Sequence, residues 1–188
     1  MNTSIAHSER LIVVVGPSGA GKDSVLQAWA ALREPGEHVH LAQRVVTRPH
    51  DGGAERHESV SEEAFATLLQ QGAFATHWNA HGQRYGVRHH ELAPLAANEW
   101  VVLNSSRAHL ATLRAQAPKL KVVEITAPAE LRAQRLAGRG REDAPEVAKR
   151  LQRDMPPVHA DLTLVNDSSL PEVARALQRW WQARQHAP

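Results

Sequence analysis

The sequence of 188 residues contains no cysteine, no long hydrophobic run and no large excess of charge of either sign. Without cysteine the chain has no disulfide, no thiolate metal site and no thiol nucleophile. The first ten residues are largely polar, and the apolar run that follows them, residues 11–15, is far too short to cross a membrane. We therefore expect a cytoplasmic protein that does not associate with membranes.

The near balance of charge also bears on partners. The 22 basic and 20 acidic side chains leave a formal net charge of +2, so bulk attraction to nucleic acid is not expected. The sequence has no internal repeat and no low-complexity segment. Its length fits a single domain, residues 1–188, that is large enough for a sizeable core.

The most informative segment that the sequence does contain is a glycine-rich loop. It follows residues 11–15, which predict a buried strand, and it precedes Val25, Leu26, Trp29 and Leu32 at helical spacing. Strand, loop and helix in this order are typical of the phosphate-binding pattern G-x-x-x-x-G-K. The loop residues are Gly16, Pro17, Ser18, Gly19, Ala20, Gly21, Lys22, Asp23 and Ser24.

Each part of this pattern has a physical role in holding the phosphates of ATP. Glycines allow successive backbone N–H groups to turn inward, and the helix that begins here adds the positive end of its dipole. Lys22 brings a full positive charge to the outer phosphates. An ordinary glycine-rich turn is the alternative, but the lysine and the flanking elements favour the phosphate loop.

One position departs from the pattern, which expects Ser or Thr after the lysine to hold Mg²⁺. Asp23 stands there, and the predicted strand 100–103 is followed by Asn104, where other phosphate-loop enzymes have an acidic residue. We expect Asp23 to hold the metal, directly or through water, because Mg²⁺ prefers one or two carboxylates beside phosphate oxygens. Ser24 is the alternative ligand, with Asp23 then facing solvent.

The rest of the chain alternates between apolar strands and amphipathic helices. Strands are predicted at residues 11–15, 38–46, 100–103, 120–126 and 161–165. Helices are predicted after the loop, from Ser61 to Gly72, from Leu110 towards Pro118, from Pro128 to about Ala137, around Val147 and Leu151, and from Leu170 onward. Residues 73–90 are predicted as short strands and turns rather than core. The pattern predicts a three-layer α/β fold with a mostly parallel five-stranded sheet and a ligand at the carboxyl ends of its strands.

Residues 132–153 are rich in arginine. Arg132, Arg135 and Arg139 lie three and four residues apart, so they share one helical face. Breaks at Gly138 and Gly140 favour a mobile lid that closes over ATP, from which Arg135, Arg139 and Arg150 reach the phosphates. A solvated basic helix or a weak RNA-binding patch is the alternative, but no interleaved aromatic residues support the RNA patch.

Five segments, taken in chain order, resemble the guanylate kinase fold family. They are the glycine loop, Thr47-Arg48-Pro49, Tyr85-Gly86, the stretch 138–141 and Val165-Asn166-Asp167, and the resemblance covers residues 10–181. Within that family the chain is similar to a subgroup that makes phosphoribosyl pyrophosphate from ribose 1,5-bisphosphate and ATP, in the phosphonate-degradation route. The loop variant and the stretches 104–110 and 139–142 carry this second resemblance.

The resemblance implies an organisation and a set of ligands. A kinase core would comprise residues 10–47 and 98–181, with an acceptor-binding region at 48–92 and a lid at about 138–146. ATP would be the co-substrate, Mg²⁺ the metal and a small sugar bisphosphate the acceptor. Asn166 would lie at the adenine side of the ATP site, although capping the final helix is its simpler role.

Departures from guanylate kinases argue separately against a guanine acceptor. Those enzymes hold the base with a serine, a glutamate and an aspartate, and this chain has Arg44, Thr76 and Ser106 at the matching places. Both carboxylates are lost, and an unpaired polar base edge in a closed site costs roughly 1–3 kcal/mol. We therefore do not expect guanine to bind.

Phosphate-binding residues are kept in part. Arg48 and Tyr85 stand where guanylate kinases hold the acceptor phosphate, whereas a second family arginine is Asp51 here and a family tyrosine is His57. Together, Arg44 and His57 would suit an acceptor with two phosphates and no base. A solvated surface position is the alternative for each of them.

The expected chemistry needs no protein base. A phosphate monoester is mostly dianionic near pH 7, since its second pKa is about 6, and it can attack the γ-phosphorus of ATP directly. A nucleoside monophosphate kinase with altered base preference is one alternative, and a catalytically silent guanylate kinase-like binding module is another. Lys22 and the arginines count against the silent module, which needs no phosphate loop. The pairs His89-His90 and His38-x-His40 lack a third metal ligand and are expected at the surface.

Overall fold

A computed structural model describes residues 4–49, 57–138, 157–167 and 169–185. The chain forms two compact units, which are described separately below. Unit 1 comprises Met1–Val13 and His38–Lys121, and unit 2 comprises Val14–Glu37 and Val122–Pro188. Among the described residues, no helix is both long enough and apolar enough to span a membrane.

The main sheet has five strands, as the sequence predicted, and the structure gives their order as β2-β7-β1-β8-β9. They are β2 (Val39–Leu41), β7 (Trp100–Asn104), β1 (Leu11–Val15), β8 (Lys121–Thr126) and β9 (Leu162–Val165). β2 pairs parallel with β7, and β8 pairs parallel with β9. Every residue of β1 and β7 is buried, which explains their nearly continuous apolar sequence.

The predicted strand 38–46 is in fact two strands that belong to different sheets. β2 ends at Leu41, and β3 (Arg44–Val46) joins a second, four-stranded sheet. Between them, the Ala42 N–H donates to the Val102 carbonyl, and the Gln43 N–H donates to the Glu91 carboxylate. The chain therefore leaves one sheet and enters the next within two residues, which an unbroken apolar pattern does not reveal.

The second sheet lies within unit 1 and has the order β4-β3-β6-β5. β4 (His57–Ser59) runs parallel to β3, whereas β6 (Gln83–Arg88) is antiparallel to both β3 and β5 (Phe74–Ala80). The expectation that residues 73–90 contribute little to a core is wrong. This segment forms a long hairpin with four buried hydrophobic side chains, namely Phe74, Trp78, Tyr85 and Val87.

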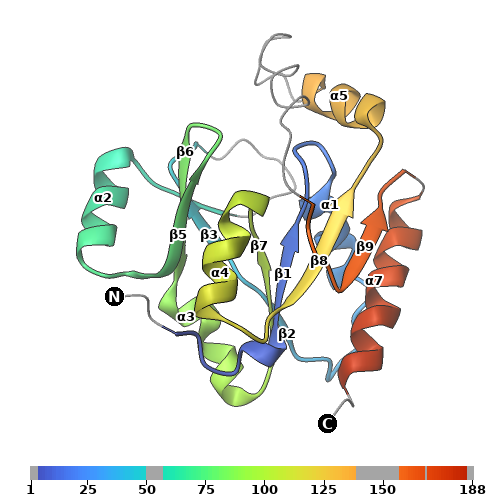
Figure 1. Ribbon diagram of the computed structural model, residues 1–188, viewed down its shortest axis with the longest axis horizontal. Coiled ribbons are helices and arrows are strands. Elements are labelled where there is room, and N and C mark those ends of the chain that lie inside the picture. The colour runs from blue at the N-terminus through green and yellow to red at the C-terminus, as the bar shows by residue number, and fades with distance from the viewer. Residues whose placement is uncertain (1–3, 50–56, 139–156, 168, 186–188) are drawn as a thin grey trace. The chain divides into compact units, whose positions relative to one another are not determined.

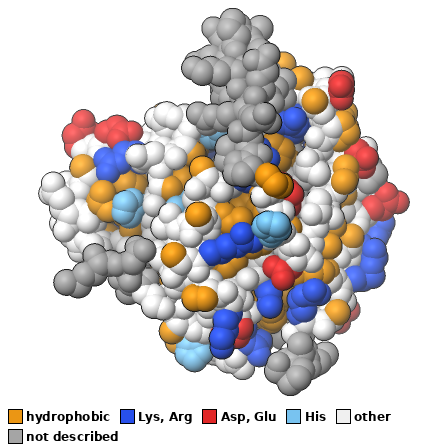
Figure 2. All heavy atoms as spheres, in the orientation of Figure 1, with side chains coloured by type: hydrophobic (Ala, Val, Ile, Leu, Met, Phe, Trp, Pro, Cys, Tyr) orange, Lys and Arg blue, Asp and Glu red, His pale blue; other side chains and the backbone are white. Residues whose placement is uncertain are grey.

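One face of the second sheet packs on helix α2 (Glu62–Gln70). The helix begins as predicted, with the Ala64 N–H donating to the Ser61 hydroxyl at the N-cap. Phe65 packs with Val45 and Phe74, and an added Cβ at Gly86 would lie 2.6 Å from the Phe74 ring. Gly86 therefore leaves space for Phe74 on this apolar face. In Figure 2, acidic side chains gather near α2, whose first turn carries Glu62 and Glu63.

The opposite face of the second sheet carries polar and aromatic side chains. Arg44 in β3 pairs with Val87 in β6 and with His57 in β4, so these three side chains share a face. A register shift in β5 between Phe74 and Thr76 places Thr76 on that same face. We call it the acceptor face and define it by its residues Arg44, His57, Thr76, Trp78 and Tyr85.

The described residues of unit 2 form the helices α1 (Lys22–Ala30), α5 (Ala129–Ala137) and α7 (Leu170–Gln185). Trp29 of α1 and Trp181 of α7 pack edge to face at 5.8 Å, and Figure 1 shows α7 beside β9. Leu32, predicted to continue the helical pattern, is 37% exposed because α1 ends two residues before it. The helix predicted around Val147 and Leu151 lies outside the described residues.

Unit 1 contains the shorter helices. In the part of unit 1 that the structure describes, these are α3 (His89–Leu92) and α4 (Leu110–Gln116), with the 3₁₀ turns η1 (Ser8–Arg10), η2 (Ala93–Ala97) and η3 (Arg107–His109). α4 ends before Pro118, as predicted. The Ser106 hydroxyl accepts the His109 N–H at the start of η3, so it serves as a backbone cap.

Candidate functional site

The glycine loop connects β1 to α1 within the structure as the sequence predicted. Its three glycines all have left-handed backbone angles, with φ of 151° at Gly16, 78° at Gly19 and 81° at Gly21. Gly21 is the N-cap of α1, which begins at Lys22. The first turn of a nine-residue helix therefore opens directly onto the loop, as phosphate binding requires.

Close neighbours explain why these three positions need glycine. An added Cβ would lie 1.9 Å from the Ile125 carbonyl oxygen at Gly16 and 2.8 Å from the Arg132 carbonyl oxygen at Gly19. At Gly21 it would lie 2.5 Å from the Asn166 side-chain nitrogen. The loop is thus held against the end of β8, the start of α5 and the end of β9, all within unit 2.

Two residues predicted for the ATP site, Arg135 and Asn166, contact the loop backbone. Arg135 Nη1 lies 3.5 Å from the Gly19 carbonyl oxygen and 3.4 Å from that of Ala20, and its Nη2 donates to the Asn166 carbonyl at 3.0 Å. The Asn166 amide in turn donates to the Ala20 carbonyl at 2.8 Å. Asn166, only 3% exposed, therefore supports the loop as well as the end of β9.

The first turn of α1 carries the positive charge of Lys22 and, at Asp23 and Ser24, side-chain oxygens of the kind that bind metal ions. Lys22 Nζ donates to the Gly16 carbonyl at 3.0 Å and to the Pro17 carbonyl at 3.3 Å, which keeps its ammonium group over the loop. Asp23 and Ser24 follow it, and both are partly exposed. One carboxylate and one hydroxyl beside nucleotide phosphates match the oxygen ligands that Mg²⁺ prefers.

A metal site can also be formed by protein side chains alone, without a nucleotide. Within the described ranges, no three His, Asp or Glu side chains form such a group. A metal held at the loop would consequently need the phosphate oxygens of its nucleotide as ligands. The residues present fit that kind of site, which Asp23 or Ser24 would complete.

Most of the predicted acceptor residues come together in unit 1. Arg44, His57 and Tyr85 are 9%, 6% and 7% exposed, so the solvated-surface alternative is wrong for Arg44 and for His57. The Arg44 Nη1 donates to the Asn104 carbonyl at 3.2 Å, and its guanidinium carbon lies 5.6 Å from the centre of the Tyr85 ring. Arg48 follows β3, and its carbonyl accepts His57 Nε2 at 3.3 Å.

Thr76 and Ser106 also have defined contacts. The Thr76 hydroxyl donates to Gln116 Oε1 at 3.1 Å and lies 2.7 Å from His109 Nε2. Because Gln116 Oε1 can only accept, the hydroxyl proton goes there and the Thr76 oxygen accepts the His109 N–H. Thr76 is 2% exposed, so its hydroxyl is fully engaged inside the protein.

Sequence reasoning missed three buried residues: Trp78 on the acceptor face, and His109 and Gln116, which both contact Thr76. His109 is 5% exposed, and burial, together with the charge of His77, lowers its pKa to about 4. Its ring is therefore neutral near pH 7. His109 lies in the stretch 104–110, which the sequence analysis had singled out for its resemblance to the subgroup. That resemblance was the available signal for a role of His109 in the site.

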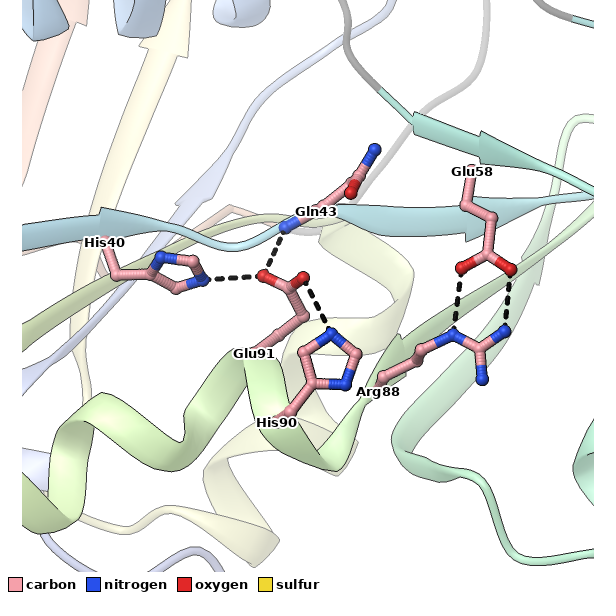
Figure 3. Close-up of polar contacts among 6 residues, drawn as sticks. All are labelled: His40, Gln43, Glu58, Arg88, His90 and Glu91. Atoms are coloured by element: carbon pink, nitrogen blue, oxygen red, sulfur yellow. Dashed lines mark hydrogen bonds and ion pairs between the residues drawn. The ribbon is translucent and has the colours of Figure 1, made fainter.

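A buried glutamate was missed as well. Glu91, 7% exposed, accepts the Gln43 N–H at 2.8 Å and contacts His40 Nε2 at 2.6 Å and His90 Nε2 at 3.3 Å (Figure 3). In the same view, Arg88 forms two hydrogen bonds with the Glu58 carboxylate, which holds the pKa of that carboxyl below its usual value. Glu91 thus fixes the chain one residue before Arg44.

Several predicted site residues lie outside the described residues. These are Arg139 and Arg150, together with the predicted lid beyond Gly138. Gly138 itself caps the C-terminus of α5.

Relatives of known name match most of the chain. A ribose 1,5-bisphosphate phosphokinase PhnN of Rhizobium etli is 39% identical over 90% of this chain and 86% of its own length. One of Pseudofrankia inefficax is 43% identical over 89% of this chain and 88% of its own. A bifunctional ribose 1,5-bisphosphokinase-thymidine phosphorylase of Azorhizobium caulinodans is 46% identical over 88% of this chain. The chain spans about a quarter of the length of such bifunctional relatives.

The comparison of structures and the comparison with family models both identify guanylate kinase. A crystal structure of guanylate kinase from Anaplasma phagocytophilum superposes with a TM-score of 0.66, covering 98% of this chain and 89% of its own at 19% identity. The family model of guanylate kinase matches residues 8–184. The chain with this phosphate loop and this second sheet belongs to the guanylate kinase family.

Proposed function

We propose that this protein is a ribose 1,5-bisphosphate phosphokinase. It transfers the γ-phosphoryl group of ATP to an acceptor phosphate and so makes 5-phosphoribosyl 1-pyrophosphate. One observation carries the proposal: the acceptor face offers the buried cation Arg44, while the Thr76 hydroxyl is engaged by Gln116 and His109. Such a face suits phosphate groups and leaves a guanine edge without a carboxylate partner.

The names of the relatives support ribose 1,5-bisphosphate as the acceptor. Two relatives that are 39% and 43% identical, and that are matched over 86% and 88% of their length, are named ribose 1,5-bisphosphate phosphokinase. The similarity to the subgroup that acts in phosphonate degradation adds the metabolic route. We place the activity in the cytoplasm, where ATP is available.

Unit 2 binds ATP, the phosphoryl donor. The loop N–H groups, the start of α1 and Lys22 bind the phosphates of ATP, and Arg135 adds positive charge beside Gly19 and Ala20. Arg139 and Arg150 complete this set as further phosphate-binding residues in our proposal. Asn166 binds at the adenine side of ATP while it supports the loop.

The acceptor half falls to unit 1. Arg44 and Arg48 bind the phosphate groups of the sugar, and His57 and Tyr85 supply polar contacts beside them. Burial of Arg44 in a low-dielectric wall strengthens its attraction for an anion. The arrangement positions a dianionic phosphate as nucleophile without a protein base.

The transfer itself balances without an additional reactant. An oxygen of the acceptor phosphate forms a bond to the γ-phosphorus of ATP, and the bond from that phosphorus to the β,γ-bridging oxygen breaks. The electron pair of the broken bond leaves with ADP. Lys22 and Arg135 stabilise the charge on the transferring group. Asp23 or Ser24 would hold Mg²⁺ together with phosphate oxygens, and the bound metal would neutralise further charge on the phosphates.

An acceptor panel tests the proposal. The protein is incubated with ATP and Mg²⁺ and with ribose 1,5-bisphosphate, GMP or AMP in turn, and the products are followed by phosphorus NMR. We expect a pyrophosphate product from ribose 1,5-bisphosphate, and its loss by a factor of about 10³ or more in Lys22→Ala. Efficient phosphorylation of GMP or AMP would favour the nucleotide-kinase alternative, and no turnover with any acceptor would favour a silent binding module.

A further inference from the structure

Four side chains of unit 1 form one continuous stack on the acceptor face. The Arg44 guanidinium carbon lies 5.6 Å from the centre of the Tyr85 ring, and the Tyr85 ring is stacked on Trp78 at 5.3 Å with an angle of 7°. Trp78 is stacked in turn on His109 at 4.7 Å with an angle of 17°. We call these four residues the column.

The register of the second sheet explains the order of the column. Its first three members come from β3, β6 and β5, which are neighbours in that order, and Trp78 lies directly opposite Tyr85. Pairs directly opposite across antiparallel strands have the closest side chains. All four members are less than 10% exposed, so the stack has little freedom to move.

Hydrogen bonds fix both ends of the column. At one end, His109 is bonded to Thr76 through its ring, and its backbone N–H is capped by Ser106. At the other end, Arg44 Nη1 donates to the Asn104 carbonyl. Because the His109 ring is neutral near pH 7, Arg44 carries the charge of the column.

We propose that Trp78 and His109 are positioning residues that hold the Tyr85 ring, and through it the Arg44 guanidinium, where the guanidinium binds a phosphate of the sugar substrate. The inference rests on the proposed function and adds residues to its acceptor site.

Substitutions at the two positioning residues test the inference. Trp78→Leu removes the central ring, and His109→Gln removes the terminal ring while keeping an N–H donor for Thr76. We expect the KM for ribose 1,5-bisphosphate to rise about tenfold or more in Trp78→Leu and about fivefold in His109→Gln. The KM for ATP should stay within about twofold, and Trp78→Phe, which restores an aromatic ring, should recover most of the loss.

Phe65→Leu is the matched control, because Phe65 packs on the opposite face of the same sheet. It should lower the melting temperature and leave both KM values unchanged. The inference is overturned if Trp78→Leu and His109→Gln behave like this control, or if they raise both KM values equally. Should Trp78→Leu fail to fold, His109→Gln decides the matter by the same split between the KM for the sugar and the KM for ATP.

The wild-type measurement separates this inference from the proposed function. Turnover of ribose 1,5-bisphosphate by the wild type tests the function alone, whereas the ratio of variant to wild-type KM tests the column. If the wild type phosphorylates another acceptor of the panel, the ratio is measured with that acceptor. An unchanged KM ratio then rejects the positioning role of Trp78 and His109, whatever the identity of the acceptor.

Discussion

Lys22 and Asp23 are consecutive residues of opposite charge in the first turn of α1. Lys22 suits the phosphates, but a carboxylate at the positive end of the helix repels them unless a cation lies between. The Asp23 carboxylate therefore favours phosphate binding only when a metal is bound. Because its repulsion of the phosphates weakens their binding in the absence of a metal, we expect Asp23 to bind the metal rather than to face solvent without a function. Ser24 offers a neutral oxygen one position later.

Asp23→Asn distinguishes the two ligands, because it keeps the shape of the side chain and removes its charge. We expect the Mg²⁺ concentration for half-maximal rate to rise about tenfold or more, measured at saturating ATP and acceptor. Ser24→Ala is the matched control and should change that concentration little. The reverse pattern would assign the metal to Ser24.

His109 is a residue whose protonation opposes folding. Its folded-state pKa of about 4 lies below the usual value near 6.5, mainly because it is buried. Between these two pH values the unfolded chain binds a proton that the folded chain does not. The free energy of unfolding therefore falls as the pH drops from about 6.5 towards 4.

Urea unfolding at pH 7 and pH 5 measures this effect. We expect the wild type to lose about 1–2 kcal/mol more between these pH values than His109→Gln does, after allowance for partial solvent screening. Other titrating groups contribute alike to both proteins, so the difference isolates His109. Equal losses in the two proteins would mean that His109 titrates normally in the folded state.

At the scale of strands and helices, local sequence predicted those elements whose environment is uniform. β1 and β7 are buried on both faces, and α2 carries its own cap at Ser61, so pattern and structure agree. The split of 38–46 into β2 and β3 escaped prediction because it depends on hydrogen bonds that this segment donates to distant residues, Val102 and Glu91. The bulge in β5 likewise becomes visible only with the register.

The same contrast divides the candidate site. The phosphate loop was readable because consecutive residues and their backbone angles form it. The acceptor face is assembled from four strands, and its residues are brought together by pairing across the sheet. Arg44, His57 and Tyr85 were named through family resemblance, whereas Trp78 and His109 acquire their positions from packing alone.

At the scale of the whole molecule, charges of both signs lie interspersed on the face drawn in Figure 2, in keeping with the nearly balanced composition. The residues with proposed roles divide between the two compact units: the loop, Arg135 and Asn166 belong to unit 2, and the acceptor face belongs to unit 1. Each substrate should therefore stabilise its own unit first. That division can be tested without turnover.

Hydrogen exchange of the intact protein provides the last prediction. ATP with Mg²⁺, in the absence of acceptor, should slow exchange in the glycine loop and the first turn of α1. Ribose 1,5-bisphosphate alone should slow exchange in β3, β6 and η3. A ligand at one hundred times its Kd stabilises the folded form by about 2.7 kcal/mol, so exchange that requires opening of the bound site slows by up to about a hundredfold. Lys22→Ala should weaken the ATP effect and spare the sugar effect, whereas Trp78→Leu should do the reverse. Protection of β3 and β6 by ATP alone, with no effect of the sugar on them, would contradict the assignment of the acceptor to unit 1.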